Sequence, residues 1–332
     1  MPAETASPAR TGLWRRFHDW LPDHVDGRVR AIAWLSFLAE TIIIGTGGAV
    51  RLTASGLGCP TWPLCTPDSL VPTAEMGIHG AIEFGNRLMT GLVGILALAL
   101  VVLVLRLRHT RRDLFVLAVI VLAGVVAQAI VGGVTVWTGL NPFIVGFHYV
   151  ASLLLVCVSA AFLVLMREPG GPRRPIVPRW YAVTAYATAV VMGMTIVVGV
   201  LTTGAGPHSG DLDAVRNGFN AEVLEHVHAW PGYAAFALTV VLLAGAWLIR
   251  ASAPGLLRWT TLLLAALLAQ IAVGLYQARN GLPELAVGTH MVLAALTAAT
   301  MTVVMLNLRA PAASTREAAD RSPRRGRAAS GT

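Results

Sequence analysis

Eight long apolar segments make up most of this 332-residue chain. A bilayer core about 30 Å thick is crossed by about 20 mostly apolar residues in a helix. Each segment meets that requirement, and the eight run approximately over 30–51, 79–105, 114–137, 144–166, 180–203, 223–249, 258–278 and 286–308. The sequence therefore predicts an all-α integral membrane protein with eight transmembrane helices, and it excludes soluble enzymes and DNA-binding proteins.

The charged residues agree with this prediction in number and in position. Only 13% of the residues are charged, whereas a soluble domain has about a quarter. All 25 basic residues are Arg, and 21 of them lie in the stretches 10–30, 106–112, 167–179, 250–258 and 309–327. The net charge of +8 thus marks topology, with no nucleic-acid partner expected. The positive-inside rule predicts a multi-pass plasma-membrane protein with both termini in the cytoplasm and the loops 52–78 and 204–222 outside.

The two ends of the chain differ from the apolar segments. Residues 1–28 and 311–332 are rich in Ala, Pro, Ser and Arg and have no apolar period. Such composition cannot bury enough apolar surface to fold, so we expect two disordered cytoplasmic tails.

An internal repeat relates the two halves of the chain at a constant offset of 142 residues. The offset superimposes Gln128 on Gln270, Gly132 on Gly274, Gly139 on Gly281, Leu140 on Leu282, Gly146 on Gly288 and His148 on His290. Because each half has an even number of helices, both halves enter the membrane in the same orientation, which argues against an inverted-repeat transporter. We predict two tandem four-helix bundles, over 29–170 and 171–310.

Ionisable side chains inside the predicted helices are costly and usually functional. By helix position they form one layer near the outer face, with one group per half: Glu83, Asn86 and His148 in the first, and Glu225, His228 and His290 in the second. Matched His residues on facing helices suit axial ligation of a heme iron, whereas a zinc site usually needs three or four protein ligands. The offset from Asn86 favours His228 over its neighbour His226.

Two further features surround the first group. Arg87 lies four residues after Glu83, within reach of an ion pair, so Arg87 either takes part in the site or merely neutralises the carboxylate. Cys59 and Cys65 lie in the predicted outer loop, where a disulfide can persist. That disulfide is either a loop staple or a redox-active pair.

Three motifs resemble the heme A synthase family, whose members oxidise a methyl group of heme O to the formyl group of heme A. The resemblance is to bacterial, actinobacterial-like members and covers about residues 30–308. It rests on the membrane His residues and on Gly47-Gly-x-Val-Arg-Leu-Thr-x-Ser-Gly-Leu-x-Cys59-Pro-x-Trp-Pro-x-Cys65, Glu83-x-x-Asn86-Arg87 and Thr202-Thr-Gly-Ala-Gly-Pro-His-Ser-Gly-Asp211.

The resemblance implies roles for these residues. His228 and His290 are similar to the axial ligands of a heme b cofactor, and His148 to the ligand of the substrate heme. Glu83 matches the essential carboxylate beside the substrate. Cys59 and Cys65 match the outer-loop disulfide of bacterial members.

One position departs from the family pattern, because Asn86 stands where the family usually has a His. Either His148 alone holds the substrate iron and leaves an open coordination position, or His79 replaces the missing ligand. His79 lies about 10 Å away along the helix, so we favour the open position. Arg51 and Arg87 are our candidates for pairing with heme propionates.

The leading hypothesis is thus an oxidoreductase with heme b as cofactor and heme O as substrate. The alternative is a non-catalytic b-type cytochrome or heme carrier, which would need neither Glu83 nor an open iron position. The resemblance adds heme O synthase and cytochrome c oxidase assembly factors as expected partners beside the lipid bilayer. The sequence does not decide whether the protein forms a homo-oligomer.

Overall fold

A computed structural model describes residues 12–312. Within this range eight helices are long and apolar enough to cross a membrane, which confirms the predicted fold class and a multi-pass membrane protein. Their ends agree with the predicted segments to within four residues. The eight are α2 (Gly27–Leu52), α3 (Gly77–Val104), α4 (Arg112–Trp137), α5 (Pro142–Leu165), α6 (Arg179–Ala205), α7 (Ala221–Leu248), α8 (Pro254–Arg279) and α9 (Glu284–Leu306).

Short elements complete the described chain. The helix α1 (Leu13–Trp20) forms inside the segment expected to be a disordered tail, while residues 1–11 and 313–332 of the two predicted tails lie outside the described residues. Strands β1 (Arg173–Pro175) and β2 (Arg309–Pro311) pair antiparallel. Two single-turn helices, η1 (Ala74–Met76) and η2 (Leu105–Leu107), flank α3.

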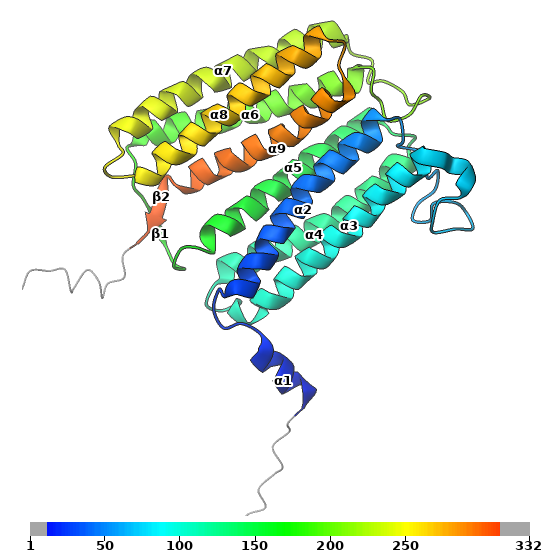
Figure 1. Ribbon diagram of the computed structural model, residues 1–332. Helices are drawn as coiled ribbons and strands as arrows, with labels where there is room; N and C mark the ends of the chain where they lie inside the picture. The colour runs from blue at the N-terminus through cyan, green and yellow to red at the C-terminus, as the bar shows by residue number, and fades with distance from the viewer. Residues whose placement is uncertain (1–11, 313–332) are drawn as a thin grey trace, which may run out of the picture.

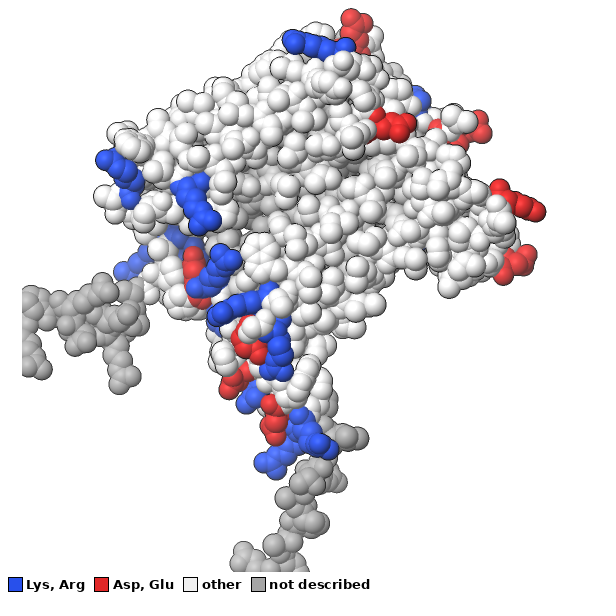
Figure 2. Space-filling model, in the orientation of Figure 1, with Lys and Arg blue, Asp and Glu red and all other residues white. Residues whose placement is uncertain are grey.

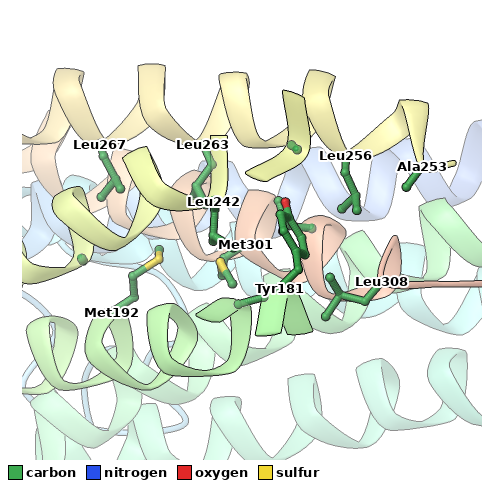
Figure 3. Close-up of a cluster of buried hydrophobic side chains, with 13 residues drawn as sticks. Tyr181, Met192, Leu242, Ala253, Leu256, Leu263, Leu267, Met301 and Leu308 are labelled. Carbon is green, nitrogen blue, oxygen red and sulfur yellow. The ribbon is translucent and has the colours of Figure 1, made fainter. Parts of the chain in front are cut away.

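The long helices pack as two groups, α2–α5 and α6–α9, which meet where α9 lies against α2 and α5 (Figure 1). Each group has a buried apolar core of its own, and Figure 3 shows the one formed by α6–α9. A third cluster joins the groups through Ile44 of α2, Val156 of α5 and Ala295 of α9. These cores leave the outward sides of the helices apolar and exposed, as a lipid environment requires.

The two ends of the molecule carry different charges. We call the end with residues 53–73 and 206–220 the loop end, and the end with α1 and the two strands the tail end (Figure 1). Figure 2 shows most of the basic side chains in view gathered around the tail end, with several acidic ones among them, and mainly acidic side chains at the opposite end. This distribution supports the predicted cytoplasmic termini, although the direction of insertion stays a prediction.

Positions 142 residues apart share local structure. Gly139 and Leu140, between α4 and α5, have φ values of 58° and 60°, and Gly281 and Leu282, between α8 and α9, have 72° and 57°. A left-handed backbone is unusual for Leu, so its recurrence at matched positions supports the predicted tandem repeat. The repeat itself stays a prediction.

Candidate functional site

Two His side chains face each other at the loop end of the second helix group. The ring centroids of His228, on α7, and His290, on α9, are 6.3 Å apart, and the ring planes are inclined by 74°. The Nδ1 atom of His228 lies 2.9 Å from the carbonyl oxygen of Thr195 on α6. Because a carbonyl only accepts, Nδ1 of His228 carries the proton and Nε2 keeps a free lone pair.

Glycines on the neighbouring helices make room for these rings. A Cβ atom at Gly199 on α6 would lie 2.6 Å from Cε1 of His228, and one at Gly274 on α8 would lie 3.2 Å from Cε1 of His290. Both distances are shorter than ordinary van der Waals contact. Each imidazole is therefore seated against a backbone surface that only Gly leaves open.

This pair fits axial ligation of a heme iron. Two metal–imidazole bonds of about 2 Å on opposite sides of one ion put the ring centres about 6 Å apart once the ring widths are included, close to the 6.3 Å found. The described chain contains no cluster of three or more His, Cys, Asp or Glu residues that could hold a metal ion. A porphyrin supplies the remaining ligands itself, so two imidazoles suffice for heme but not for zinc.

The neighbours of His228 on α7 point elsewhere. His226 is exposed, and its Nδ1 lies 2.9 Å from the carbonyl oxygen of Glu222 in the preceding turn. Glu225, which the repeat relates to Glu83, is exposed too. The geometry thus agrees with the choice of His228 over His226, and the acidic position of the second group does not enter the interior.

His148 occupies the matching place in the first helix group. It lies on α5, and a Cβ atom at Gly132 on α4 would lie 3.6 Å from its Cε1 atom. Its Nδ1 atom is buried and has no hydrogen-bond partner in the structure. The side chain of Gln128 on α4 donates to the carbonyl oxygen of His148 at 2.7 Å and to the hydroxyl of Ser152, and not to the ring. No hydrogen bond at Nδ1 therefore fixes which ring nitrogen of His148 carries the proton.

Glu83 is 5% exposed and binds the loop above α3 through both carboxylate oxygens. The amide of Cys59 donates to Oε2 at 2.6 Å, and Nη2 of Arg87 donates to Oε1 at 2.6 Å. Arg87 also donates to the carbonyl oxygens of Cys59, Thr61 and Leu64. The predicted ion pair is therefore present, and together these two residues anchor the loop to α3.

The anchored loop folds back onto the helices. Cys59 and Cys65 are joined by a disulfide within it. The indole of Trp62 sits where a Cβ atom at Gly133 would be 2.5 Å away, and it packs edge-on against Trp137 at 5.3 Å between centroids. Because Gly133 adjoins Gly132, which faces His148, the loop covers α4 beside the first His.

Asn86 and His79 contact α2 and the residues that follow it. The Oδ1 atom of Asn86 accepts from the Thr46 hydroxyl at 2.7 Å. His79 is exposed inside helical α3, and its Nδ1 lies 2.9 Å from Oγ of Ser55. A replacement ligand at His79 would need the start of α3 to unwind, whereas the helix is intact there.

Arg51 joins the two helix groups at the loop end. Its Nε donates to the carbonyl oxygen of His208 at 2.8 Å, and its Nη2 to that of Thr203 at 3.1 Å. The ring of His208 in turn lies 2.9 Å from the carbonyl oxygen of Leu282. Arg51 therefore holds the 206–220 connection, a contact that sequence reasoning did not anticipate.

The residues that surround the three His residues were also missed as site residues. The sequence contained a signal for Gln128, Gln270, Gly132 and Gly274, because the repeat superimposes them in pairs. The Thr195 carbonyl and Gly199 left no such signal, since neither belongs to the repeat.

Comparison with known proteins gives consistent relatives. A profile of the COX15-CtaA family, described as cytochrome oxidase assembly protein, matches residues 30–207. Proteins named heme A synthase from Halalkalibacterium halodurans and Exiguobacterium sibiricum are both 30% identical, over 47% and 50% of this chain and 55% and 56% of their own lengths. One from Listeria monocytogenes is 26% identical over 65% of this chain and 73% of its own length.

The matched part thus spans about half the length of the first two relatives. The family profile itself covers more than half of the present chain. The chain therefore belongs to the COX15-CtaA family of cytochrome oxidase assembly proteins.

Proposed function

We propose that this protein is a heme A synthase, an oxidoreductase that converts the methyl group of heme O to the formyl group of heme A for terminal oxidase assembly. The observation that carries the proposal is the facing pair His228 and His290, 6.3 Å apart between centroids, in a chain whose relatives are named heme A synthase. Heme b bound between these rings would supply electron transfer.

In the second half, 171–310, the rings of His228 and His290 would hold heme b through their Nε2 atoms. The Thr195 carbonyl fixes the proton of His228 on the opposite nitrogen, so this ring is ready to bind. Gly199 and Gly274 seat the two rings.

In the first half, 29–170, His148 binds the substrate heme O, and Asn86 leaves the opposite coordination position open. The Thr46 hydroxyl holds the Asn86 carboxamide, which supports Asn86 as a wall of the site and not as a ligand. Heme O enters from the bilayer, where its apolar tail remains.

Glu83 is the carboxylate beside the substrate in this proposal. The Cys59 amide and the Arg87 guanidinium bind its two oxygens. Glu83 would thus be held in one position, where it orients the substrate and holds the disulfide loop over it. Arg51 and Arg87 remain the candidates for the propionates, although both already bind backbone carbonyl oxygens.

The cellular setting follows from the same proposal. The tail end faces the cytoplasm, and the loop end with its disulfide faces outward. Heme O synthase and oxidase assembly factors are the expected partners, and a homo-oligomer is compatible with the exposed apolar helices.

The test is pigment analysis after co-expression with a source of heme O. The wild-type protein should contain low-spin heme b and accumulate heme A. Glu83→Ala should abolish heme A while the heme b spectrum persists. Glu225→Ala is the matched control, because the same residue type at the repeat-related position is exposed, and it should keep activity.

Heme b without heme A or a hydroxylated product in the wild type would refute the enzyme and leave an electron-transferring b-type cytochrome or heme carrier. Loss of the heme b spectrum in Glu83→Ala would instead make Glu83 a structural residue.

A further inference from the structure

The short helix α1 lies at the tail end and runs crosswise to the long helices (Figure 1). Nη1 of Arg28, on α2, donates to the carbonyl oxygen of Trp20 at 3.0 Å. Nη1 of Arg106, on η2, donates to the carbonyl oxygen of Leu21 at 3.2 Å. These two bonds hold α1 at the boundary where the transmembrane segments leave the bilayer.

A cavity of about 150 Å³ lies between α1 and η2. Three of its lining residues are apolar, and the other three carry a guanidinium or an imidazole. The lining residues are Phe17, His18, Leu21, Leu105, Arg106 and Arg108. Apolar side chains beside cationic ones suit an amphiphilic anion, whose hydrocarbon and charged group need different surroundings at one place.

The two guanidinium groups of this cavity bind only backbone oxygens. Arg106 donates to the Leu21 carbonyl oxygen and Arg108 to the Leu105 carbonyl oxygen, each at 3.2 Å. Neither forms an ion pair within residues 12–312. Each guanidinium has further N–H groups that can donate to an anion.

Acidic residues lie near the cavity, but each is paired with another side chain. The pairs are Asp19 with His18 at 3.8 Å, Asp23 with His24 at 2.7 Å and Asp26 with Arg28 at 2.8 Å. His24 and, more weakly, Arg106 lower the pKa of Asp23. Of the lining residues only His18 belongs to one of these pairs, so the charge of both lining guanidinium groups is available to a ligand.

The exposed side chains of α1 also suit a membrane surface. The rings of Phe17 and Trp20 stack at 6.2 Å between centroids, and Trp20 is 53% exposed. Arg15 and Arg16 are exposed on the same helix. Exposed aromatic and basic residues on a short amphipathic helix are typical of helices that lie in the interface of a bilayer.

We propose that the cavity between α1 and η2 binds the headgroup of an anionic phospholipid. Arg106 and Arg108 donate to the phosphate oxygens, as guanidinium groups commonly do. The apolar lining residues receive the hydrocarbon next to the headgroup. Basic pockets beside transmembrane helices take such headgroups in other membrane proteins. No His ligand takes part, so this site does not depend on the proposed function.

The experiment measures lipid binding to the purified full-length protein by native mass spectrometry. The protein in detergent is titrated with phosphatidylglycerol and, for comparison, with the zwitterionic phosphatidylcholine. The test variant carries Arg106→Gln and Arg108→Gln. The matched control carries Arg250→Gln and Arg258→Gln, which remove two exposed positive charges from the tail end of the other helix group.

The wild type should bind phosphatidylglycerol more tightly than phosphatidylcholine. The test variant should lose about 30-fold in affinity for phosphatidylglycerol, because each Arg near an anionic headgroup contributes about fivefold. The control variant should stay close to the wild type, and inorganic phosphate should not displace the lipid.

Equal wild-type affinities for the two lipids would overturn the proposal, as would an unchanged affinity for phosphatidylglycerol in the test variant. An equal loss in the control variant would show diffuse surface charge in place of a site. Displacement of the lipid by inorganic phosphate would assign the cavity to a soluble anion. Should the test variant fail to fold, Arg108→Gln alone, at an exposed side chain, should still lose about fivefold, and a wild-type affinity in it would overturn the proposal.

Discussion

Replacing Gly199 by Ala tests directly whether the packing of the His228 ring against Gly199 governs heme binding. The added Cβ atom would lie 2.6 Å from Cε1 of the ring, whereas ordinary contact begins at 3.4 Å. The ring must therefore retreat by about 0.8 Å, since the Gly199 backbone is held in α6. A shift of that size weakens the 2.9 Å bond from Nδ1 to the Thr195 carbonyl and displaces Nε2.

Gly199→Ala should affect heme binding more strongly than it affects the stability of the fold. Loss of an outer-shell partner lowers metal affinity about 10- to 100-fold, so, on the proposed function, Gly199→Ala should lose most of the heme b on purification. Global stability should fall by no more than about 2 kcal/mol, because overpacking costs about 1–3 kcal/mol and Ala in a helix returns about 1 kcal/mol.

Other glycines in the chain provide a graded control series. Gly274→Ala would meet His290 at 3.2 Å and should lose part of its heme, and Gly132→Ala would meet His148 at an ordinary 3.6 Å. A Cβ atom at Gly193, on the same helix α6, would have no neighbouring atom within 4 Å, so Gly193→Ala should match the wild type. The assay is the heme-to-protein ratio of the purified protein, with thermal unfolding by circular dichroism beside it. Gly199→Ala with a wild-type heme ratio would refute the reasoning.

Two further predictions concern stability. Desolvation raises the pKa of Asp26, the N-cap of α2, but hydrogen bonds from the Val29 amide and a neighbouring guanidinium outweigh it and hold the pKa below its ordinary value. The contribution of ionised Asp26 to the free energy of unfolding is thus complete above the unfolded-state pKa of about 3.9. It is lost as pH falls through the lower folded-state pKa. Asp26→Ala should cost about 1 kcal/mol at neutral pH, and Asp26→Asn should flatten the pH dependence of thermal unfolding; an unchanged acid slope in Asp26→Asn would contradict this. Glu40 is 3% exposed, and both its oxygens lie 2.8 Å from the Ser159 hydroxyl. The free energy of unfolding in detergent should therefore stay within about 1 kcal/mol of wild type in Glu40→Gln. In Glu40→Ala it should fall by about 2–4 kcal/mol, because the change leaves a cavity and an unsatisfied hydroxyl. Equal losses in both Glu40 variants would show that the negative charge itself is required.

The membrane fold was predictable because the bilayer fixes the length of every helix. The segments followed from apolar length alone, and their ends were set by local signals such as the Asp26 cap and Pro142 at the start of α5. The pairing of His228 with His290 was predictable for a related reason. The repeat offset selected His228, and helix rise put both residues at the same depth.

The loop side of Glu83 was beyond the sequence. Its ion pair with Arg87 followed from helical spacing, but its bond to the Cys59 amide depends on how a loop of more than 20 residues returns to α3, and no helical period describes that path. The acceptor of the His228 proton is a backbone carbonyl, which every residue has, so residue type gives no signal for Thr195. Helix α1 was missed because its eight residues carry a narrow apolar face within a polar segment.

The two halves differ most where the proposed function needs them to differ. In the second half, each His ring has a polar neighbour at Nδ1, and the acidic position Glu225 is exposed. In the first half, Nδ1 of His148 is unpartnered and Glu83 is buried under a closed loop. A cofactor that stays bound gains from fixed imidazoles, while a substrate that must leave gains from a less firmly held ligand. On the proposed function, these differences between two halves of similar fold therefore distinguish the site of the retained heme from the site of the exchanged heme.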